Sequence, residues 1–344
     1  MTGPIPHWPG RLISLGDHDV YVRSAASAET SPAETSPAET SPAETSPAEA
    51  SPAETSAEPA LCVHGLEGSS RNWTDLMDVL RPRLDCDALD LPGFGDSPPR
   101  PDGRYSIAAY AQTITKLIEH RARGPVHLLD NSLSGAACVK VAATRPELVR
   151  TLTLISPALP DPRPRRDLLN FPLLSLPGVG TRLIRRLRLL PPESRVANVI
   201  TNCFSDPQRF APERFAAEVA ELARRDALDW PPAALAGSAR ALTAAYFRVG
   251  RASVWREAAR VRAPALVIYG ADDRVVDARI AGRAAHAFPG ARIVVMPRTG
   301  HLAHMEHPHL VAAEISVLLT LSTGGATQGG QAKQAREFPL GRAG

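Results

Sequence analysis

The sequence has few cysteines and no pairing pattern among them. Cys62, Cys86, Cys138 and Cys203 are scattered along the chain without a C-x-x-C motif. The first three lie in or beside expected core segments, which favours small buried side chains over a disulfide framework. The N-terminus also lacks the basic, apolar and small-residue succession of a signal peptide. We therefore expect a reducing, cytoplasmic location.

The chain also lacks a strong charge imbalance and a membrane-spanning run. It has 39 Lys and Arg against 36 Asp and Glu, a net charge of +3, which is too small to indicate a nucleic-acid partner. Its most apolar stretch, residues 167–192, is interrupted by prolines and too short to cross a bilayer. From these features we expect a globular protein whose partner is a small molecule.

What the chain does have is enough apolar residues for one large domain with additions. It contains 344 residues, of which 44% are hydrophobic, so it can bury a sizeable core. Tandem S-P-A-E-T units predict a disordered insertion at residues 26–58, and a Gly- and Gln-rich tail predicts disorder at 322–344. The core is assigned to the remaining outer segments, residues 1–25, 59–158 and 258–321, and helical spacing predicts a separate unit at 159–257.

A serine follows a short apolar strand at residues 126–135, V-H-L-L-D-N-S-L-S-G. Small residues and a helical stretch come directly after Ser132. A serine on a sharp strand-to-helix turn holds its hydroxyl over the end of a sheet, where a base can reach it. A plain helix cap is the alternative for a serine in this position, so the rest of the chain decides.

Three more apolar strands end in residues that such a serine needs. The first strand, at residues 60–63, is followed by His64-Gly65, which places the N–H of Leu66 at a turn. The second, at residues 265–270, is followed by an acidic turn with Asp272 and Asp273, and the third, which begins at residue 292, is followed by Gly300-His301. Serine, aspartate and histidine, each after a strand and in this chain order, match the order of the α/β-hydrolase triad.

On these motifs the chain resembles a serine hydrolase of the α/β-hydrolase superfamily. The resemblance implies a mostly parallel, doubly wound α/β sheet, a helical cap at 159–257, and no cofactor. It also implies a set of catalytic groups: the nucleophile Ser132, the base His301, the acid Asp273, and the oxyanion N–H groups of Leu66 and Leu133. Asp272 is the alternative acid, less favoured because the family's acid usually lies three residues after the strand-end glycine, here Gly270.

Two positions depart from the family pattern, and the milder departure is Ser134, which stands where G-x-S-x-G has its second glycine. Asp130 stands two residues before Ser132, where the family has glycine, and adds bulk and charge beneath a site that must stabilise an oxyanion. An aspartate nucleophile is a possible role for it, as in dehalogenase-like relatives. That register would put the branched Leu128 where a small residue is needed, so serine chemistry is favoured.

The remaining histidines are interpreted as structural. His64 is expected to brace the oxyanion loop, and Glu306 to interact with a helix dipole. His304, His307 and His309 surround His301, but Pro308 interrupts them and no ligand set is complete, so surface or capping roles are expected.

The expected function is hydrolysis of a carboxylic ester with an apolar moiety, since the chain and its Leu-rich cap favour an apolar pocket. Carbon–carbon bond hydrolysis, acyl transfer and a catalytically weakened ligand-binding role are the alternatives. One expected helical face carries Leu183, Ile184, Leu187 and Leu190, and much of the rest carries Arg182, Arg185, Arg186 and Arg188. This pattern predicts a cap helix packed on the core with solvated arginines, and contact with an anionic membrane surface is the alternative.

Overall fold

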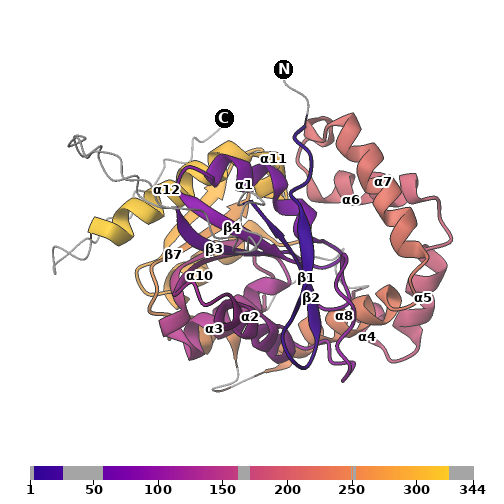
Figure 1. The fold of residues 1–344 in the computed structure, drawn as a ribbon, viewed down its shortest axis with the longest axis horizontal. Coiled ribbons are helices and arrows are strands. Elements are labelled where there is room, and N and C mark those ends of the chain that lie inside the picture. Colours follow the sequence, from indigo (N-terminus) through magenta and orange to yellow (C-terminus); the bar gives the residue numbers. More distant parts are fainter. Residues whose placement is uncertain (1–3, 26–56, 162–170, 249, 251–252, 325–344) are drawn as a thin grey trace, which may run out of the picture.

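An eight-stranded sheet forms the centre of the described molecule (Figure 1). The structure is a computed structural model that describes residues 4–25, 57–161, 171–248, 250 and 253–324. The strands are ordered β1-β2-β4-β3-β5-β6-β7-β8, and all neighbours are parallel except β1 with β2 and β2 with β4. Their bounds are β1 Gly10–Ser14, β2 Asp19–Ser24, β3 Glu58–Val63, β4 Leu84–Leu89, β5 Val126–Asn131, β6 Val149–Ile155, β7 Ala265–Gly270 and β8 Arg292–Met296.

Helices cover both faces of this sheet, because alternate strand residues point to opposite sides. Leu128 of β5 packs in one apolar cluster with α2 and α3, and Leu129 packs in the other with α1 and α12. The covering helices are α1 (Thr74–Leu80), α2 (Ile107–Arg121), α3 (Ser134–Thr144), α10 (Ala281–Ala287), α11 (Ala303–Glu306) and α12 (Pro308–Gly324). The predicted doubly wound, mostly parallel α/β fold is confirmed.

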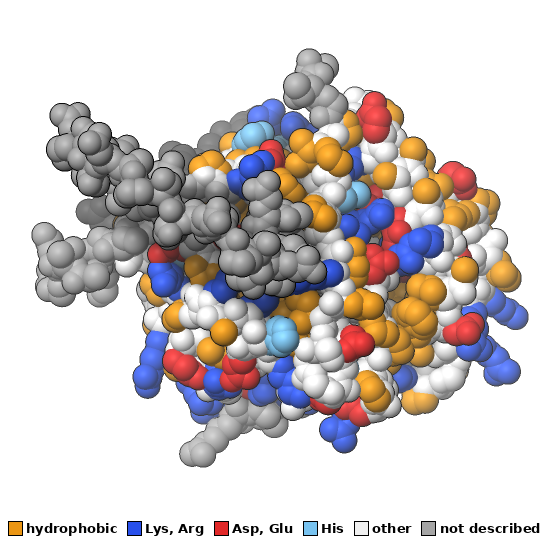
Figure 2. All heavy atoms as spheres, viewed as in Figure 1, with side chains coloured by type: hydrophobic (Ala, Val, Ile, Leu, Met, Phe, Trp, Pro, Cys, Tyr) orange, Lys and Arg blue, Asp and Glu red, His pale blue; other side chains and the backbone are white. Residues whose placement is uncertain are grey.

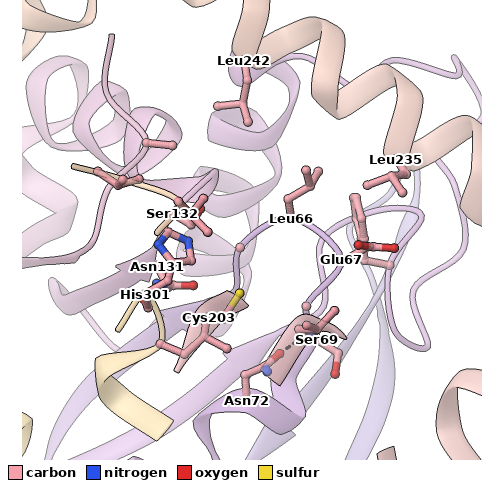
Figure 3. Close-up of a pocket in the computed structure, with 18 of the residues that line it drawn as sticks. Leu66, Glu67, Ser69, Asn72, Asn131, Ser132, Cys203, Leu235, Leu242 and His301 are labelled. Carbon is pink, nitrogen blue, oxygen red and sulfur yellow. Dashed lines mark hydrogen bonds between the residues drawn. The ribbon is translucent and has the colours of Figure 1, made fainter. Parts of the chain in front are cut away.

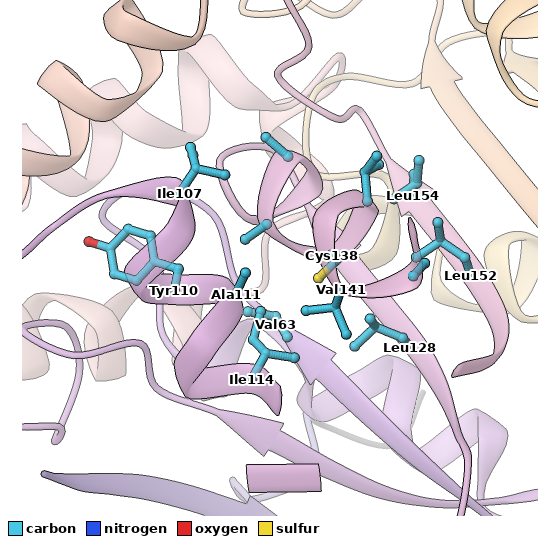
Figure 4. Close-up of a cluster of buried hydrophobic side chains, with 14 of the residues drawn as sticks. Val63, Ile107, Tyr110, Ala111, Ile114, Leu128, Cys138, Val141, Leu152 and Leu154 are labelled. Carbon is cyan, nitrogen blue, oxygen red and sulfur yellow. The ribbon is translucent and has the colours of Figure 1, made fainter. Parts of the chain in front are cut away.

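The helix α2 shows how the sequence sets these elements. Its N-cap Ser106 accepts the N–H of Ala109 at 3.1 Å, and the chain leaves the helix at Ala122 with a left-handed φ of 50°. Apolar residues at helical spacing turn one face inward, where Ile107, Tyr110, Ala111 and Ile114 meet Val63, Leu128 and Cys138 (Figure 4). Cys62, Cys86 and Cys138 are buried as predicted.

A helical segment lies between β6 and β7, at one side of the sheet (Figure 1). It contains α4 (Phe171–Ser175), α5 (Val179–Leu187), α6 (Pro192–Cys203), α7 (Pro212–Asp226), α8 (Pro231–Phe247) and α9 (Val254–Ala258). We call α4 to α8 the cap. The last helix, α9, instead packs on α3, with Trp255 in the main core cluster.

The cap helix α5 differs from its prediction. Gly180 and Ile184 are its buried residues, whereas Leu183 and Leu187 are exposed. Its apolar face is therefore divided between the interior and the surface, and the expectation that the leucines pack together on the core is wrong.

Two predicted boundaries of disorder also need correction. Glu58 begins β3 and pairs with Leu84 of β4, so the strand starts inside the segment assigned to the repeat. Residues 322–324 continue α12. The other parts of both predicted disordered segments, residues 26–56 and 325–344, lie outside the described residues. Within the described chain, no helix is long and apolar enough to cross a membrane.

Candidate active site

Ser132 occupies the sharp turn between β5 and α3. Its φ is 60°, in the left-handed region that a residue with a side chain rarely adopts. Two hydrogen bonds hold the turn: the N–H of Ser132 donates to Ile155 O at 3.1 Å, and the N–H of Gly135 donates to Ser132 O at 3.1 Å. Such strain persists only where the surroundings impose it, and it is typical of functional turns.

The turn tolerates Ser134 in place of the family's second glycine. The Ser134 hydroxyl donates within the turn, with Val63 O at 2.9 Å and Asn131 O at 3.0 Å. The tight approach occurs one residue later, at Gly135, where an added Cβ would lie 2.7 Å from Pro157 Cβ. The helix therefore packs against the sheet through Gly135.

His301 and Asp273 form a buried pair. The Nδ1–H of His301 donates to Asp273 Oδ2 at 2.8 Å, which leaves Nε2 as the ring nitrogen for a substrate or a nucleophile. The other carboxylate oxygen accepts the N–H groups of Val275 and Val276 at 2.7 and 2.8 Å. Burial raises the pKa of Asp273, but His301 and these two N–H groups outweigh it, and the net pKa is lowered.

The neighbouring Asp272 has a different partner. It accepts the hydroxyl of Ser205 at 2.7 Å, and its own N–H donates to Thr299 O. Of the two aspartates considered from the sequence, Asp273 is the one that the structure places on His301.

Ser132 and His301 meet at one wall of a cavity, with Asn131 beside them (Figure 3). No hydrogen bond joins Ser132 Oγ to His301 among the described residues. Hydrogen bonds between a catalytic base and its nucleophile often tighten only in the complex with substrate. Asn131 fixes the wall, because its amide donates to Ile155 O at 3.0 Å and to His301 O at 3.2 Å.

The loop after β3 approaches Ser132 closely. A Cβ on Gly65 would lie 2.9 Å from Asn131 Oδ1 and 3.0 Å from Ser132 Cβ, so only glycine fits. Neither Leu66 N–H nor Leu133 N–H donates to another group of the described chain. Both are the groups that the sequence assigns to an oxyanion hole, and both are left available for a ligand.

His64 braces this loop, as expected. Its Nδ1 donates to Gly65 O at 2.7 Å, and its Nε2 accepts the N–H of Leu91 at 2.9 Å. Burial lowers the pKa of His64 to about 4, so the ring is neutral at pH 7. A neutral ring that donates on one side and accepts on the other holds a fixed position.

Asp130 points away from the cavity into the core. It is fully buried beneath the turn, and neither carboxylate oxygen has a hydrogen-bond partner among the described residues. Burial raises the pKa of Asp130 well above its usual range, because an unpaired charge is costly there. Of the two nucleophiles considered from the sequence, Ser132 is therefore the one that lines the cavity.

The His301 turn is bonded to the cap, a contact that the sequence did not indicate. The N–H groups of His301 and Leu302 donate to Cys203 O at 2.7 and 3.2 Å. Glu306 accepts the N–H of Gly300 at 2.7 Å and also those of Ser205 and Asp206. Glu306 is the acidic residue in the first turn of the short helix α11, and it also joins the Gly300 turn to the loop after α6, a role that the sequence did not indicate.

The histidines near His301 do not form a metal site. His304 is fully buried and stacks on Trp73 with ring centroids 4.4 Å apart, so its predicted surface position is wrong. Burial, together with nearby His301, lowers the pKa of His304 to about 3. His307 bonds Arg298 O, and His309 is exposed. The described residues contain no group of three or more His, Cys, Asp or Glu that could hold a metal.

The cavity lies between the cap and the carboxyl ends of the strands, and its volume is about 580 Å³. Most of its wall is apolar. The core contributes Leu66, Phe94, Leu159 and Leu302, and the cap contributes Ile184, Val196, Ile200, Phe204, Leu235 and Leu242. This size and lining suit a small organic molecule.

Charged side chains gather at the cap side of the same cavity. Arg188 and Arg195 pair with Asp226, at 3.0 and 2.6 Å. Arg225 lies near Glu67, whose side chain projects from the loop after β3 (Figure 3). A ligand with a polar group could place that group here and its apolar part against the remaining wall.

A family model described as the alpha/beta hydrolase fold matches residues 59–308. The chain belongs to this family. The matched range contains the Ser132 turn, the loop of Leu66, and both members of the His301–Asp273 pair. The family assignment made from the sequence is confirmed.

The relatives of this α/β hydrolase are named for different reactions. A putative 2-succinyl-6-hydroxy-2,4-cyclohexadiene-1-carboxylate synthase of Bacillus subtilis is 24% identical, over 77% of this chain and 91% of that protein. A 2-hydroxy-6-oxononadienedioate/2-hydroxy-6-oxononatrienedioate hydrolase of Cupriavidus pinatubonensis is 25% identical, over 73% and 83%. Among solved structures, a putative lipase of Acinetobacter baumannii matches with a TM-score of 0.69 and 17% identity, over 92% of each chain. The last likeness shows the fold alone.

Proposed function

We propose that the protein is a serine hydrolase that cleaves a carboxylic ester with an apolar moiety through an acyl-enzyme. The observation that carries this proposal is the His301 Nδ1–Asp273 Oδ2 hydrogen bond, at the cavity wall that also contains Ser132. This pair fixes the imidazole tautomer, so that Nε2 can accept a proton from the serine hydroxyl. It needs no cofactor.

The reaction follows in two steps. Ser132 Oγ attacks the ester carbonyl while His301 Nε2 takes its proton, and the N–H groups of Leu66 and Leu133 hold the oxyanion. His301 then protonates the leaving alcohol. Water, activated by the same nitrogen, releases the acid and restores Ser132. Asp273 stays ionised and stabilises the imidazolium, which agrees with its lowered pKa.

The apolar wall supports the substrate assignment. Each additional methylene that the cavity takes from water contributes about 0.8 kcal/mol. We therefore expect kcat/KM on p-nitrophenyl esters to rise as the acyl chain lengthens, by up to about fourfold per methylene, until the cavity is filled.

Hydrolysis of p-nitrophenyl esters by purified protein tests this proposal. Ser132→Ala should lower turnover by about 10⁴-fold or more, and Asp273→Asn by a similar factor, because each removes a member of the triad. Asp272→Asn is the matched control and should retain activity within about tenfold. A folded Ser132→Ala variant with full activity would refute the proposal. An inactive wild type that still binds ester analogues would favour a ligand-binding role instead.

Carbon–carbon bond hydrolysis is the second candidate. The relative from Cupriavidus pinatubonensis is named for a dienedioate, and the arginines at the cap side of the cavity could face a substrate carboxylate. Turnover of that dienedioate, followed through loss of its conjugated chromophore, separates the two reactions. A kcat/KM higher on the dienedioate than on any tested ester would replace the ester assignment.

A further inference from the structure

The cap carries an exposed apolar strip with no partner in the described structure. Residues at helical spacing through and beside α5 form it: Leu176, Val179, Leu183, Leu187 and Leu190. Their exposed fractions are 47, 50, 37, 46 and 49%. Single exposed leucines are ordinary on a protein surface, but five exposed apolar side chains in one helix and the residues that flank it form a patch. We call these five residues the leucine strip.

More apolar side chains are exposed on the helices beside it. Leu173 of α4 is 46% exposed, and Phe247 at the end of α8 is 78% exposed. The helices α4, α5 and α8 pack on one another, and the Ser175 and Thr243 hydroxyls join α4 to α8 at 2.6 Å. The exposed apolar side chains therefore lie on helices that are packed and hydrogen-bonded to one another.

Basic side chains border the strip. Arg182, Arg185 and Arg186 of α5 are exposed, and none forms an ion pair with a described residue. In the space-filling view, blue side chains project from the edge of the molecule where Figure 1 places α5, with orange surface beside them (Figure 2). Residues 171–192 contain four arginines and no aspartate or glutamate, a net charge of +4, against +3 for the whole chain.

We propose that this surface docks the protein on a membrane that contains anionic lipid. A helix with leucines on one side and arginines beside them lies in the plane of a lipid interface, where the leucines enter the acyl boundary and the arginines meet negative headgroups. A second copy of the chain fits less well, because a symmetric contact through this face would bring the two sets of arginines together.

Docking places the cavity next to the lipid. Ile184 of α5 and Arg188, which directly follows the helix, line the cavity, while the residues of the leucine strip are exposed. An amphipathic molecule leaving the bilayer would therefore meet the helix that forms the cavity wall. This inference is independent of the reaction, since binding to lipid can be measured without turnover.

Co-sedimentation of the full chain with vesicles tests the proposal. The vesicles contain phosphatidylcholine with about a third phosphatidylglycerol, against phosphatidylcholine alone as the comparison. We expect binding to the anionic vesicles that weakens as salt rises, because exposed charges are screened. Arg182→Gln/Arg186→Gln should weaken it by about 30-fold, at about fivefold per arginine.

Matched substitutions elsewhere serve as controls. Leu183→Ser/Leu187→Ser should weaken binding at least about tenfold, whereas Leu310→Ser/Leu321→Ser, which changes two exposed leucines of α12, should not. Arg260→Gln/Arg262→Gln removes the same charge from another exposed segment and should have a smaller effect. Circular dichroism checks that each variant is folded.

Three results would overturn the proposal. The first is no binding to anionic vesicles at low salt, and the second is an equal loss of binding in the strip variants and their controls. The third is a dimer, seen by light scattering without lipid, that Leu183→Ser/Leu187→Ser dissociates. That result would assign the strip to a contact between copies.

Discussion

Glu306 Oε2 lies 2.7 Å from the N–H of Gly300, which directly precedes His301. The same carboxylate accepts the N–H groups of Ser205 and Asp206 of the cap, at 3.2 and 2.9 Å. One buried side chain therefore holds both the turn of the proposed base and the loop after α6. The position of that cap loop is therefore linked to the turn of His301 through the Glu306 carboxylate.

Glu306→Gln keeps the size of the side chain and replaces its charged acceptor with an amide. Hydrogen bonds to charged groups contribute about 1.5–3 kcal/mol, so we expect the free energy of unfolding to fall by about 1–3 kcal/mol, with a loss of ester turnover. Urea unfolding measures the first and p-nitrophenyl ester hydrolysis the second. Glu314→Gln, which changes a carboxylate paired with exposed Arg292, is the control and should alter stability by less than about 1 kcal/mol. Equal effects of both variants would contradict this role of Glu306.

Gly65→Ala should reduce turnover by about 10–100-fold, because a Cβ there meets Ser132 Cβ at 3.0 Å and Asn131 Oδ1 at 2.9 Å and displaces the loop that carries Leu66. Steady-state kinetics on a p-nitrophenyl ester measure it. Gly282→Ala is the matched control, since nothing lies within 4 Å of the added Cβ in α10. It should leave turnover unchanged. A fully active Gly65→Ala would show that the position of this loop does not limit the reaction.

Asp130 should make stability depend on pH. Burial raises its pKa in the folded protein, while in the unfolded chain the pKa is about 3.9. The folded state therefore binds the proton more tightly, so this stabilisation is complete below the unfolded pKa and is lost as pH rises through the folded pKa. Relative to Asp130→Asn, which does not titrate, the wild type should lose free energy of unfolding as pH increases above about 4. Urea unfolding over a pH series measures the difference. A difference that is constant with pH would show that Asp130 keeps its usual pKa.

Deleting residues 26–56 should preserve folding and turnover. Both ends of this segment lie at one end of β4, because the N–H of Ala25 donates to Cys86 O and that of Glu58 to Arg83 O, each at 3.0 Å. A Gly/Ser linker of about five residues can join them, and the shorter connection favours the folded state by about 1–2 kcal/mol. Thermal unfolding and ester hydrolysis measure the outcome. A Gly/Ser replacement of the original length separates loss of the repeat from loss of length. Insoluble or inactive protein in both variants would show that the repeat contributes to the fold.

The sequence predicted the parts of the site that depend on local patterns. Apolar runs of four to six residues followed by Gly, Ser or Asp identify strands that end at one edge of a sheet, and the chain order of these residues suggests a triad. The spacing from Gly270 also favoured Asp273 over Asp272, and Asp273 is the residue that bonds His301. These features are encoded within a few neighbouring residues.

Other features depend on contacts between distant parts of the chain. Glu306 bonds the loop at Ser205, about 100 residues earlier, and His304 is buried because it stacks on Trp73. Neither partner can be read from its own surroundings. The helical spacing of Leu183 and Leu187 likewise indicates that they share a face, but it does not say whether that face packs inward. Ile184 turns to the interior while these leucines remain exposed.

Labelling with a fluorophosphonate, followed by peptide mapping, tests the central claim most directly. The reagent phosphonylates a serine that is activated by a neighbouring base. We expect one adduct per chain, on the peptide that contains Ser132, with labelling abolished in Ser132→Ala and strongly slowed in Asp273→Asn. An adduct on another residue, or equal labelling of Ser132→Ala, would contradict the account.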